Sequence, residues 1–186
     1  MGTRGFLTFV ADGVEKTTYN HSDSYPGGLG HDVLTWLRTI SDWSAVHKQV
    51  NALRVVSDES EPTSEDIERL RRFADKGVGS RRLEEWYVLL RLTQGDPAAM
   101  LEAGIVLDAS DFPVDSLFAE WGYVVDLDAA VFEVYRGFQQ EPHERGRFAG
   151  RGTRPSYSGT YYPVALVKSW PLDQLPADAE FFPSGD

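Results

Sequence analysis

The sequence predicts a single α+β domain over residues 1–186, built on an antiparallel β-sheet of about five strands that come from both ends of the chain. Two stretches of strand-like alternation, one near the N-terminus and one from Glu120 to Tyr135, each contain a turn signal in the middle. Between them, apolar residues recur at helical spacing over about 31–104. Strands at both ends and helices in the middle are typical of a sheet that a helical segment covers on one face.

The N-terminal hairpin is the clearest single element. Gly5–Val10 and Val14–Tyr19 alternate in the manner of strands, and Asp12-Gly13 separates them. A two-residue hairpin turn of type I′ needs positive φ at both central positions, which Asp-Gly tolerates well. The sequence therefore predicts two paired strands here.

The C-terminal part supplies the other three strands. Glu120–Tyr135 is predicted to be strand, turn and strand, with the bend at 126–129, and Tyr161–Ser169 is a further β-rich run. The stretch between them, about 139–158, is rich in Gly, Arg and Pro and has no periodicity. Because nothing in it is expected to bury enough apolar surface to offset the entropy of ordering, we predict a flexible loop.

Three capping signals divide the helical segment. Thr63 stands three residues before Asp66, as in a capping box, although Glu or Gln is more usual at the later position. Ser80 is expected to cap a second helix. Asp96-Pro97 begins a third helix, and Gly104 ends it.

The composition of the chain excludes several kinds of chemistry. It has no cysteine, so a disulfide framework, a thiol nucleophile and a cysteine-ligated metal are excluded. Its four histidines are His21, His31, His47 and His143. No two of them form an H-x-x-x-H pair, so we expect no metal site and no cofactor. The net charge of -11 argues against nucleic acid and favours a basic protein as the partner. No apolar run approaches the roughly 20 residues of a membrane span and no signal-peptide core is visible, so we expect no membrane association and a cytoplasmic location.

The stretch Asn20–Gly30, N-H-S-D-S-Y-P-G-G-L-G, is the first candidate site because it joins the N-terminal hairpin to the first helix. One interpretation is that glycines before a helix point free backbone N–H groups at a small anion. The other is that Asx and Ser turns hold a sharp strand-to-helix corner, and it is favoured because no lysine follows the glycines as in a P-loop. The candidate ligand-binding residues are Arg4, Asn20, His21, Asp23, Tyr25, Gly28 and Gly30.

An acidic stretch is the second candidate site. Nine acidic residues and no Lys or Arg lie between Asp96 and Glu133. Charge of one sign attracts a partner of the other sign, so we expect a basic protein to bind exposed members of this stretch, Asp108, Asp111 and Asp115. Asp126 and Asp128 share one strand face and could hold a divalent ion, but shaping the turn is the favoured interpretation, because the sequence supplies no further oxygen ligands.

Four motifs carry a resemblance to a known family: G-T-R-G at 2–5, the Asn20–Gly30 stretch, E-W-G-Y-V-V-D-L-D-A-A-V-F-E-V at 120–134, and K-S-W-P-L-D-Q-L-P at 168–176. They resemble those of an uncharacterised protein family of actinobacteria and their phages, which has more distant look-alikes in fungi. The resemblance covers both sheet-forming ends, implies a phage or actinobacterial context, and supplies no catalytic residue.

These observations together predict a non-enzymatic, phage-encoded accessory protein that acts on an actinobacterial host by contact with a host protein. The alternative is a hydrolase-like enzyme or a small-anion binder at Asn20–Gly30. An N-terminal-nucleophile hydrolase would need Thr3 at the mature terminus, whereas removal of Met1 exposes Gly2. A His21-based site would use Asp23 or Ser24 as its partner.

Overall fold

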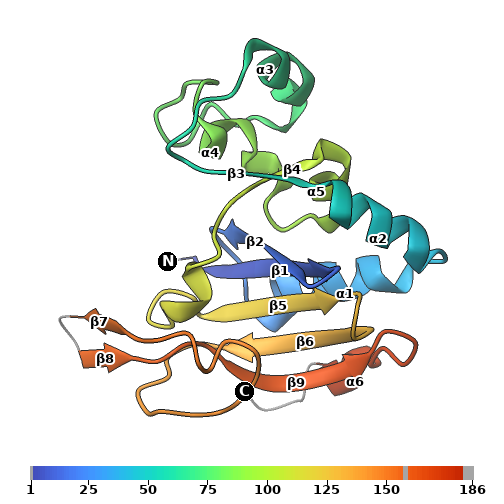
Figure 1. Ribbon diagram of the computed structural model, residues 1–186, viewed down its shortest axis with the longest axis vertical. Helices are drawn as coiled ribbons and strands as arrows, with labels where there is room; N and C mark the ends of the chain where they lie inside the picture. The colour runs from blue at the N-terminus through green and yellow to red at the C-terminus, as the bar shows by residue number, and fades with distance from the viewer. Residues whose placement is uncertain (1, 157–158, 182–186) are drawn as a thin grey trace.

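The computed structural model describes residues 2–156 and 159–181. Its main sheet has five strands in the order β2-β1-β5-β6-β9 (Figure 1), and these are the strands that the sequence predicts from the two chain ends. Their bounds are β1 Gly5–Ala11, β2 Val14–Asn20, β5 Trp121–Asp126, β6 Val131–Arg136 and β9 Ala165–Pro171. The fifth strand thus begins at Ala165 and not at Tyr161. Pro163 lies just before it, and proline has no backbone N–H to donate to a neighbouring strand.

The prediction of an antiparallel sheet is wrong at one junction, where β1 and β5 run parallel with Gly5 opposite Trp121. Each predicted hairpin is antiparallel within itself. The chain leaves β2 beside the start of β1 and re-enters at that same end of the sheet as β5. Because β2 has already brought the chain back along β1, a connection that returns at the same end places β5 parallel to β1, and the sheet is therefore mixed.

The connection contains helices, short helical turns and two further strands. In chain order they are η1 Pro26–Gly30, α1 His31–Arg38, α2 Trp43–Ala52, β3 Arg54–Val56, α3 Ser64–Leu70, η2 Arg71–Phe73, α4 Trp86–Leu89, η3 Arg91–Thr93, α5 Pro97–Ala103, β4 Ile105–Leu107 and η4 Phe112–Val114. The remaining elements are the hairpin β7 Arg154–Ser156 and β8 Gly159–Tyr161, and the short α6 Asp178–Phe181.

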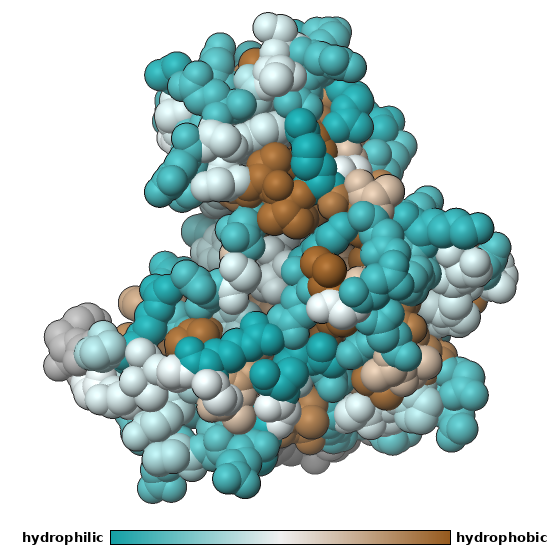
Figure 2. Space-filling view, in the orientation of Figure 1, coloured by the Kyte–Doolittle hydropathy of each residue, from teal (hydrophilic) through white to brown (hydrophobic). Residues whose placement is uncertain are grey.

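Only part of the helical segment covers the sheet. Helix α1 lies behind the sheet in Figure 1, and α1 and α2 bury Leu34 and Val50 in one core with Leu7, Phe9 and side chains of β5 and β6. Residues 54–107 lie above the sheet in Figure 1, and in this upper lobe β3 and β4 pair in parallel. Met100 and Val106 join the core of the sheet from this segment. The lobe has its own core of Leu70, Phe73, Trp86, Leu89, Leu90, Ala103 and Ile105. Figure 2 shows apolar side chains gathered between the lobe and the sheet.

The capping predictions are confirmed at two of three places. Thr63 and Asp66 form a capping box at the start of α3, and Asp96 caps α5, which ends at left-handed Gly104. The Ser80 prediction is wrong, since α4 begins at Trp86 with Glu85 before it. Ser80 instead donates its backbone N–H to the Glu85 carboxylate at 2.9 Å.

The stretch predicted to be a flexible loop covers the other face of the sheet. Phe148 is fully buried against Phe6 and Tyr135. Arg147 pairs with Asp126 at 2.6 Å and with Glu133 at 2.8 Å. The premise that this stretch has nothing to bury is therefore wrong, while its flexibility stays a prediction. Residues 157 and 158 of the predicted loop lie outside the described residues.

Among the residues that the structure describes, no helix combines the length and the apolar character that crossing a bilayer requires.

Candidate functional site

Both sequence-predicted sites lie at or near the end of the sheet where β1 and β5 begin and β2 and β6 end. Gly5 is opposite both Asn20 and Trp121, and Trp121 is opposite Arg136. The 20–30 corner therefore meets the segments that flank the β5–β6 hairpin.

The backbone of the corner is satisfied from within. Gly28 donates its N–H to the Tyr25 carbonyl at 2.9 Å, Leu29 donates to the Asp23 carbonyl at 2.8 Å, and Gly30 also donates to the Tyr25 carbonyl. The interpretation that these groups point freely at an anion is thus wrong. These backbone hydrogen bonds agree with the favoured interpretation, in which turns hold the strand-to-helix corner.

The corner's side chains are also used internally. Asn20 is buried and donates its amide to the Ser22 carbonyl at 2.6 Å and to Ser24 Oγ at 2.8 Å. The buried Tyr123 hydroxyl donates to the Ser24 carbonyl at 2.9 Å. A Cβ on Gly28 would lie 2.0 Å from the Asp23 carbonyl oxygen, so only glycine fits there. These contacts explain why a polar stretch folds as a rigid joint.

His21 is exposed and has one described side-chain partner, the Tyr19 hydroxyl at 3.0 Å. Partial burial lowers the His21 pKa, and the positive charges of Arg91 and Arg4 lower it further. Neither Asp23 nor Ser24 bonds to the imidazole, so the proposed catalytic pairing with one of them is not formed. Asp23 instead occupies the left-handed region, with φ of 55°.

The seven candidate ligand-binding residues do not share one pocket. Arg4 and His21 line a hollow of about 380 Å³ together with Phe118 and Phe138. A separate hollow of about 340 Å³ contains candidates Asn20 and Asp23. The remaining three, Tyr25, Gly28 and Gly30, line neither hollow.

We call Arg4, Phe118, Arg136 and Phe138 the aromatic surface; all of them except Arg136 line the first hollow. Phe118 is 41% exposed and Phe138 is 45% exposed. The Arg4 guanidinium lies over the Phe118 ring at 5.3 Å, and that of Arg136 lies over the Phe138 ring at 5.5 Å. Arg136 also covers the Trp121 ring at 4.3 Å. Exposed aromatics that alternate with arginine are typical of binding surfaces.

Phe138 is held in an unfavourable backbone conformation. Its φ is 58°, a region that bulky side chains rarely occupy, and its N–H donates to the Ser116 carbonyl at 2.7 Å. The backbone is therefore strained in order to place an aromatic ring in solvent. Sequence reasoning missed this surface because Phe118 and Phe138 are single aromatics in segments without periodicity. The available signal was their position, just outside a hairpin whose ends must meet.

The acidic residues differ in their surroundings. Asp108 is exposed and accepts hydrogen bonds from Ser110, and the Asp111 side chain is 90% exposed. The Asp115 side chain is only 20% exposed and lies 3.8 Å from Arg154. The prediction that all three are exposed is thus wrong for Asp115.

At the opposite end of the sheet, Asp126 and Asp128 have different partners. Asp126 Oδ1 accepts the N–H groups of Asp128 and Ala129, and its Oδ2 binds Arg147. This geometry agrees with the favoured turn-shaping interpretation. The Asp128 carboxylate accepts the N–H groups of Gly13 and Asp12, which lower its pKa.

The fold and its sites define a mixed-sheet α+β protein with an arginine-framed aromatic surface. Comparisons of the chain with protein-family models, with curated proteins and with solved structures find no match.

Proposed function

We propose that this chain is a non-enzymatic protein that binds another protein through the aromatic surface. The observation that carries the proposal is the pair Phe118 and Phe138, each more than 40% exposed, which both line one hollow. Aromatic and arginine side chains dominate the energetic centres of protein interfaces, because they bury large areas with few rotors.

The cost of this arrangement supports a binding role. A phenylalanine that stays 41–45% exposed forgoes on the order of 1 kcal/mol of burial free energy. Phe138 adds the strain of its positive φ, which is of order 1–3 kcal/mol. Contact with a partner would recover the burial term and offset the strain.

The acidic residues fit the same surface as an outer ring of charge. Asp111 precedes Phe112, whose ring lies 5.0 Å from that of Tyr19, and the Tyr19 hydroxyl binds His21 at the rim of the hollow. Asp108 and Asp111 would attract a partner with basic residues around an apolar centre and would raise its association rate. Arg154 lies 3.9 Å from Asp111 and 3.8 Å from Asp115, but Asp115 is excluded from this role because its side chain is only 20% exposed, against 90% for Asp111.

The partner that we propose is a host protein in the cytoplasm of an actinobacterium, with this chain supplied by a phage. The basis for that context is the resemblance of the terminal motifs. The alternative, a hydrolase or small-anion binder at the 20–30 corner, loses support because the corner's N–H groups and Asn20 are bonded internally.

The test is affinity capture from an actinobacterial lysate, quantified by mass spectrometry. Wild-type protein is compared with the double variant Phe118→Ser/Phe138→Ser and with Leu92→Ser. Leu92 is a matched control because it is 54% exposed and lies outside the aromatic surface. We expect one or a few proteins to be enriched by the wild type and by Leu92→Ser and lost with the double variant. Equal capture by all three would refute the aromatic surface as the binding site.

A further inference from the structure

The two hairpin turns at the far end of the sheet lie side by side. Strands β1 and β5 are parallel neighbours, so the turn at Asp12 and Gly13 adjoins the turn at 127–130, and Leu127 donates its N–H to the Val10 carbonyl at 3.0 Å. The Asp128 carboxylate bridges the turns, accepting the N–H of Asp12 at 2.9 Å and that of Gly13 at 2.8 Å. Its orientation is thereby fixed.

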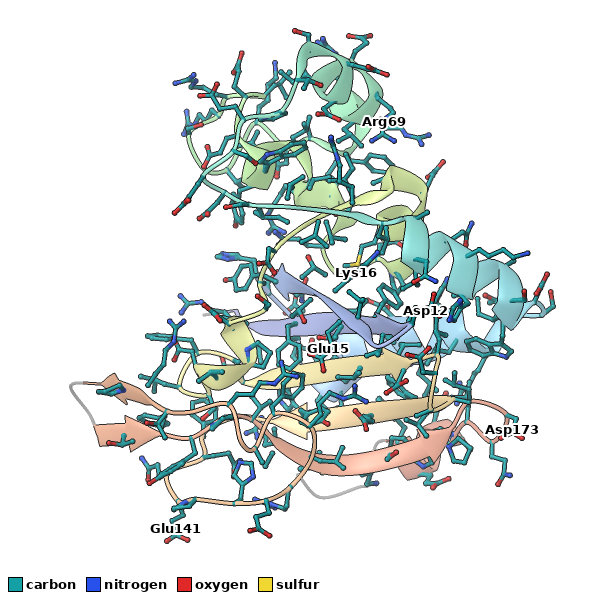
Figure 3. All side chains as sticks on the ribbon, viewed as in Figure 1. Asp12, Glu15, Lys16, Arg69, Glu141 and Asp173 are labelled. Carbon is teal, nitrogen blue, oxygen red and sulfur yellow. The ribbon has the colours of Figure 1, made fainter. Side chains whose placement is uncertain are left out.

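Helix α2 brings an imidazole to the same place. The buried Lys16 ammonium donates to the carbonyls of Val50, Asn51 and Leu53 at 2.8 Å each, which anchors the end of α2 on β2. One turn earlier, His47 Nε2 lies 3.4 Å from Asp12 Oδ1 and 3.4 Å from Asp128 Oδ1. Figure 3 shows Asp12 at the hairpin end beside this helix.

The spacing of these three groups suits a shared ion better than direct hydrogen bonds. An N–H···O bond is most favourable near 2.9–3.0 Å, so 3.4 Å is long for two such contacts. Two ligand atoms that are each about 2.1 Å from a tetrahedral ion are about 3.4 Å apart. Ligand atoms of all three residues lie within 4.8 Å of one another, and the Asp12 side chain is 68% exposed.

The surroundings position the ligands and leave one side open. Asn51 follows His47 by one helical turn, lies 3.5 Å from its Nδ1 and donates to Asp12 Oδ2, so it contacts two of the three ligands. His47 also lines a cavity of about 730 Å³ whose walls include Trp43, Lys48, Leu127 and Leu172. Three protein ligands beside a cavity leave a coordination position for water or for a bound molecule.

We propose that Asp12, His47 and Asp128 bind a divalent first-row transition-metal ion of the Zn²⁺ class, with its open position toward this cavity. The imidazole decides the class of ion, because oxygen ligands alone suit Mg²⁺ and Ca²⁺, whereas imidazole suits Zn²⁺ and its neighbours. The sequence predicts no metal site, since the histidines lack the usual spacing. Ligands at positions 12, 47 and 128 meet only through the parallel pairing of β1 with β5, which that spacing cannot reveal.

Isothermal titration calorimetry of the full chain with ZnCl₂, and separately with MgCl₂ and CaCl₂, tests the site. We expect saturable Zn²⁺ binding at one ion per chain and at least tenfold weaker Mg²⁺ and Ca²⁺ binding. His47→Gln and Asp12→Asn should each weaken Zn²⁺ binding at least about tenfold. Asp12→Asn is suited to the left-handed turn position and keeps the metal-free fold testable by circular dichroism.

His31→Gln is the matched control, because His31 also lies on a helix but lies outside the cluster. It should bind Zn²⁺ as the wild type does. The proposal is overturned if Zn²⁺ gives no saturable heat, or if His47→Gln binds Zn²⁺ as tightly as the wild type. Mg²⁺ or Ca²⁺ binding as strong as that of Zn²⁺ would equally overturn it, since it would indicate attraction to acidic surface alone.

Discussion

The corner at 20–30 and the aromatic surface lie at the same end of the sheet but use their residues in opposite ways. The corner is rich in groups that bind ligands, yet the N–H groups of Gly28, Leu29 and Gly30 and the Asn20 amide are bonded within it, and Ser24 is bonded to Thr3 and Tyr123. The aromatic surface is unremarkable in sequence, yet it leaves two phenylalanines in solvent and strains the backbone at one of them. A polar motif is therefore weak evidence of a site until its hydrogen bonds are assigned.

The largest effect that this contrast predicts is that of Gly28→Ala. The added Cβ would lie 2.0 Å from the Asp23 carbonyl oxygen, so the backbone of the corner must move. We expect a loss of about 3 kcal/mol in the free energy of unfolding, measured by urea denaturation. Gly27→Ala is the control, because a Cβ on this neighbouring glycine of the corner would lie 3.4 Å from the Tyr25 ring, an ordinary contact. A Gly28→Ala protein as stable as the wild type would contradict a corner that serves as a rigid joint.

Tyr123→Phe should have the next largest effect. It removes the hydroxyl that donates to the Ser24 carbonyl at 2.9 Å and leaves that buried acceptor unpaired. We expect a loss of about 1.5 kcal/mol, measured by the same denaturation. Tyr25→Phe is the control, because Tyr25 is exposed and should lose nothing measurable. If both variants were equally stable, the hydrogen bonds of the corner would matter less than its steric fit.

Replacement of Asp108 and Asp111 by serine tests the second region of the comparison, the aromatic surface. Both are exposed, so stability should change by less than about 0.5 kcal/mol. The association rate with the captured partner should fall and should depend less on salt, measured by stopped-flow or biosensor kinetics over a salt series. Asp58→Ser/Glu59→Ser, on the upper lobe, removes the same charge elsewhere. If both pairs of substitutions changed the association rate equally, the change would come from net charge and not from the position of Asp108 and Asp111.

The smallest effect concerns the pKa of His21. Burial and the charges of Arg91 and Arg4 lower it, so its NMR titration midpoint should lie below the ordinary value of 6.5. Because the folded-state pKa is the lower one, the stability that His21 contributes is complete above the unfolded pKa and is lost as the pH falls through the folded pKa. Arg4→Gln should move the midpoint upward. A midpoint above 6.5 would mean that the arginines do not act on His21.

Much of the fold follows from local patterns, and the failures have physical causes. Asp12 and Gly13 have positive φ of 51° and 72°, as a type I′ hairpin requires, and the strands predicted at both ends form one sheet. The direction of β1 against β5 depends on where a long connection returns, which alternation does not encode. The sequence also does not predict β3 and β4, because each is only three residues long and the two strands are far apart in the chain.

The stretch at 139–156 shows that composition alone does not reveal what a segment can bury. Its Gly, Arg and Pro content indicates flexibility, but its contacts with the sheet include a buried phenylalanine and arginines paired with carboxylates. Phe148 is fully buried, and Arg147 meets two carboxylates of β5 and β6. The candidate site was likewise predicted in part: Arg4 and His21 do line a hollow, but its phenylalanines come from segments without a pattern.

The most direct test of the account is urea unfolding of the Phe118→Ser/Phe138→Ser double variant that fails to capture a partner. If these side chains serve binding and not folding, each substitution should change the free energy of unfolding by less than about 0.5 kcal/mol. A loss of several kcal/mol, comparable to that of Gly28→Ala, would show that the aromatic surface is part of the folding core and would contradict its role as a binding site.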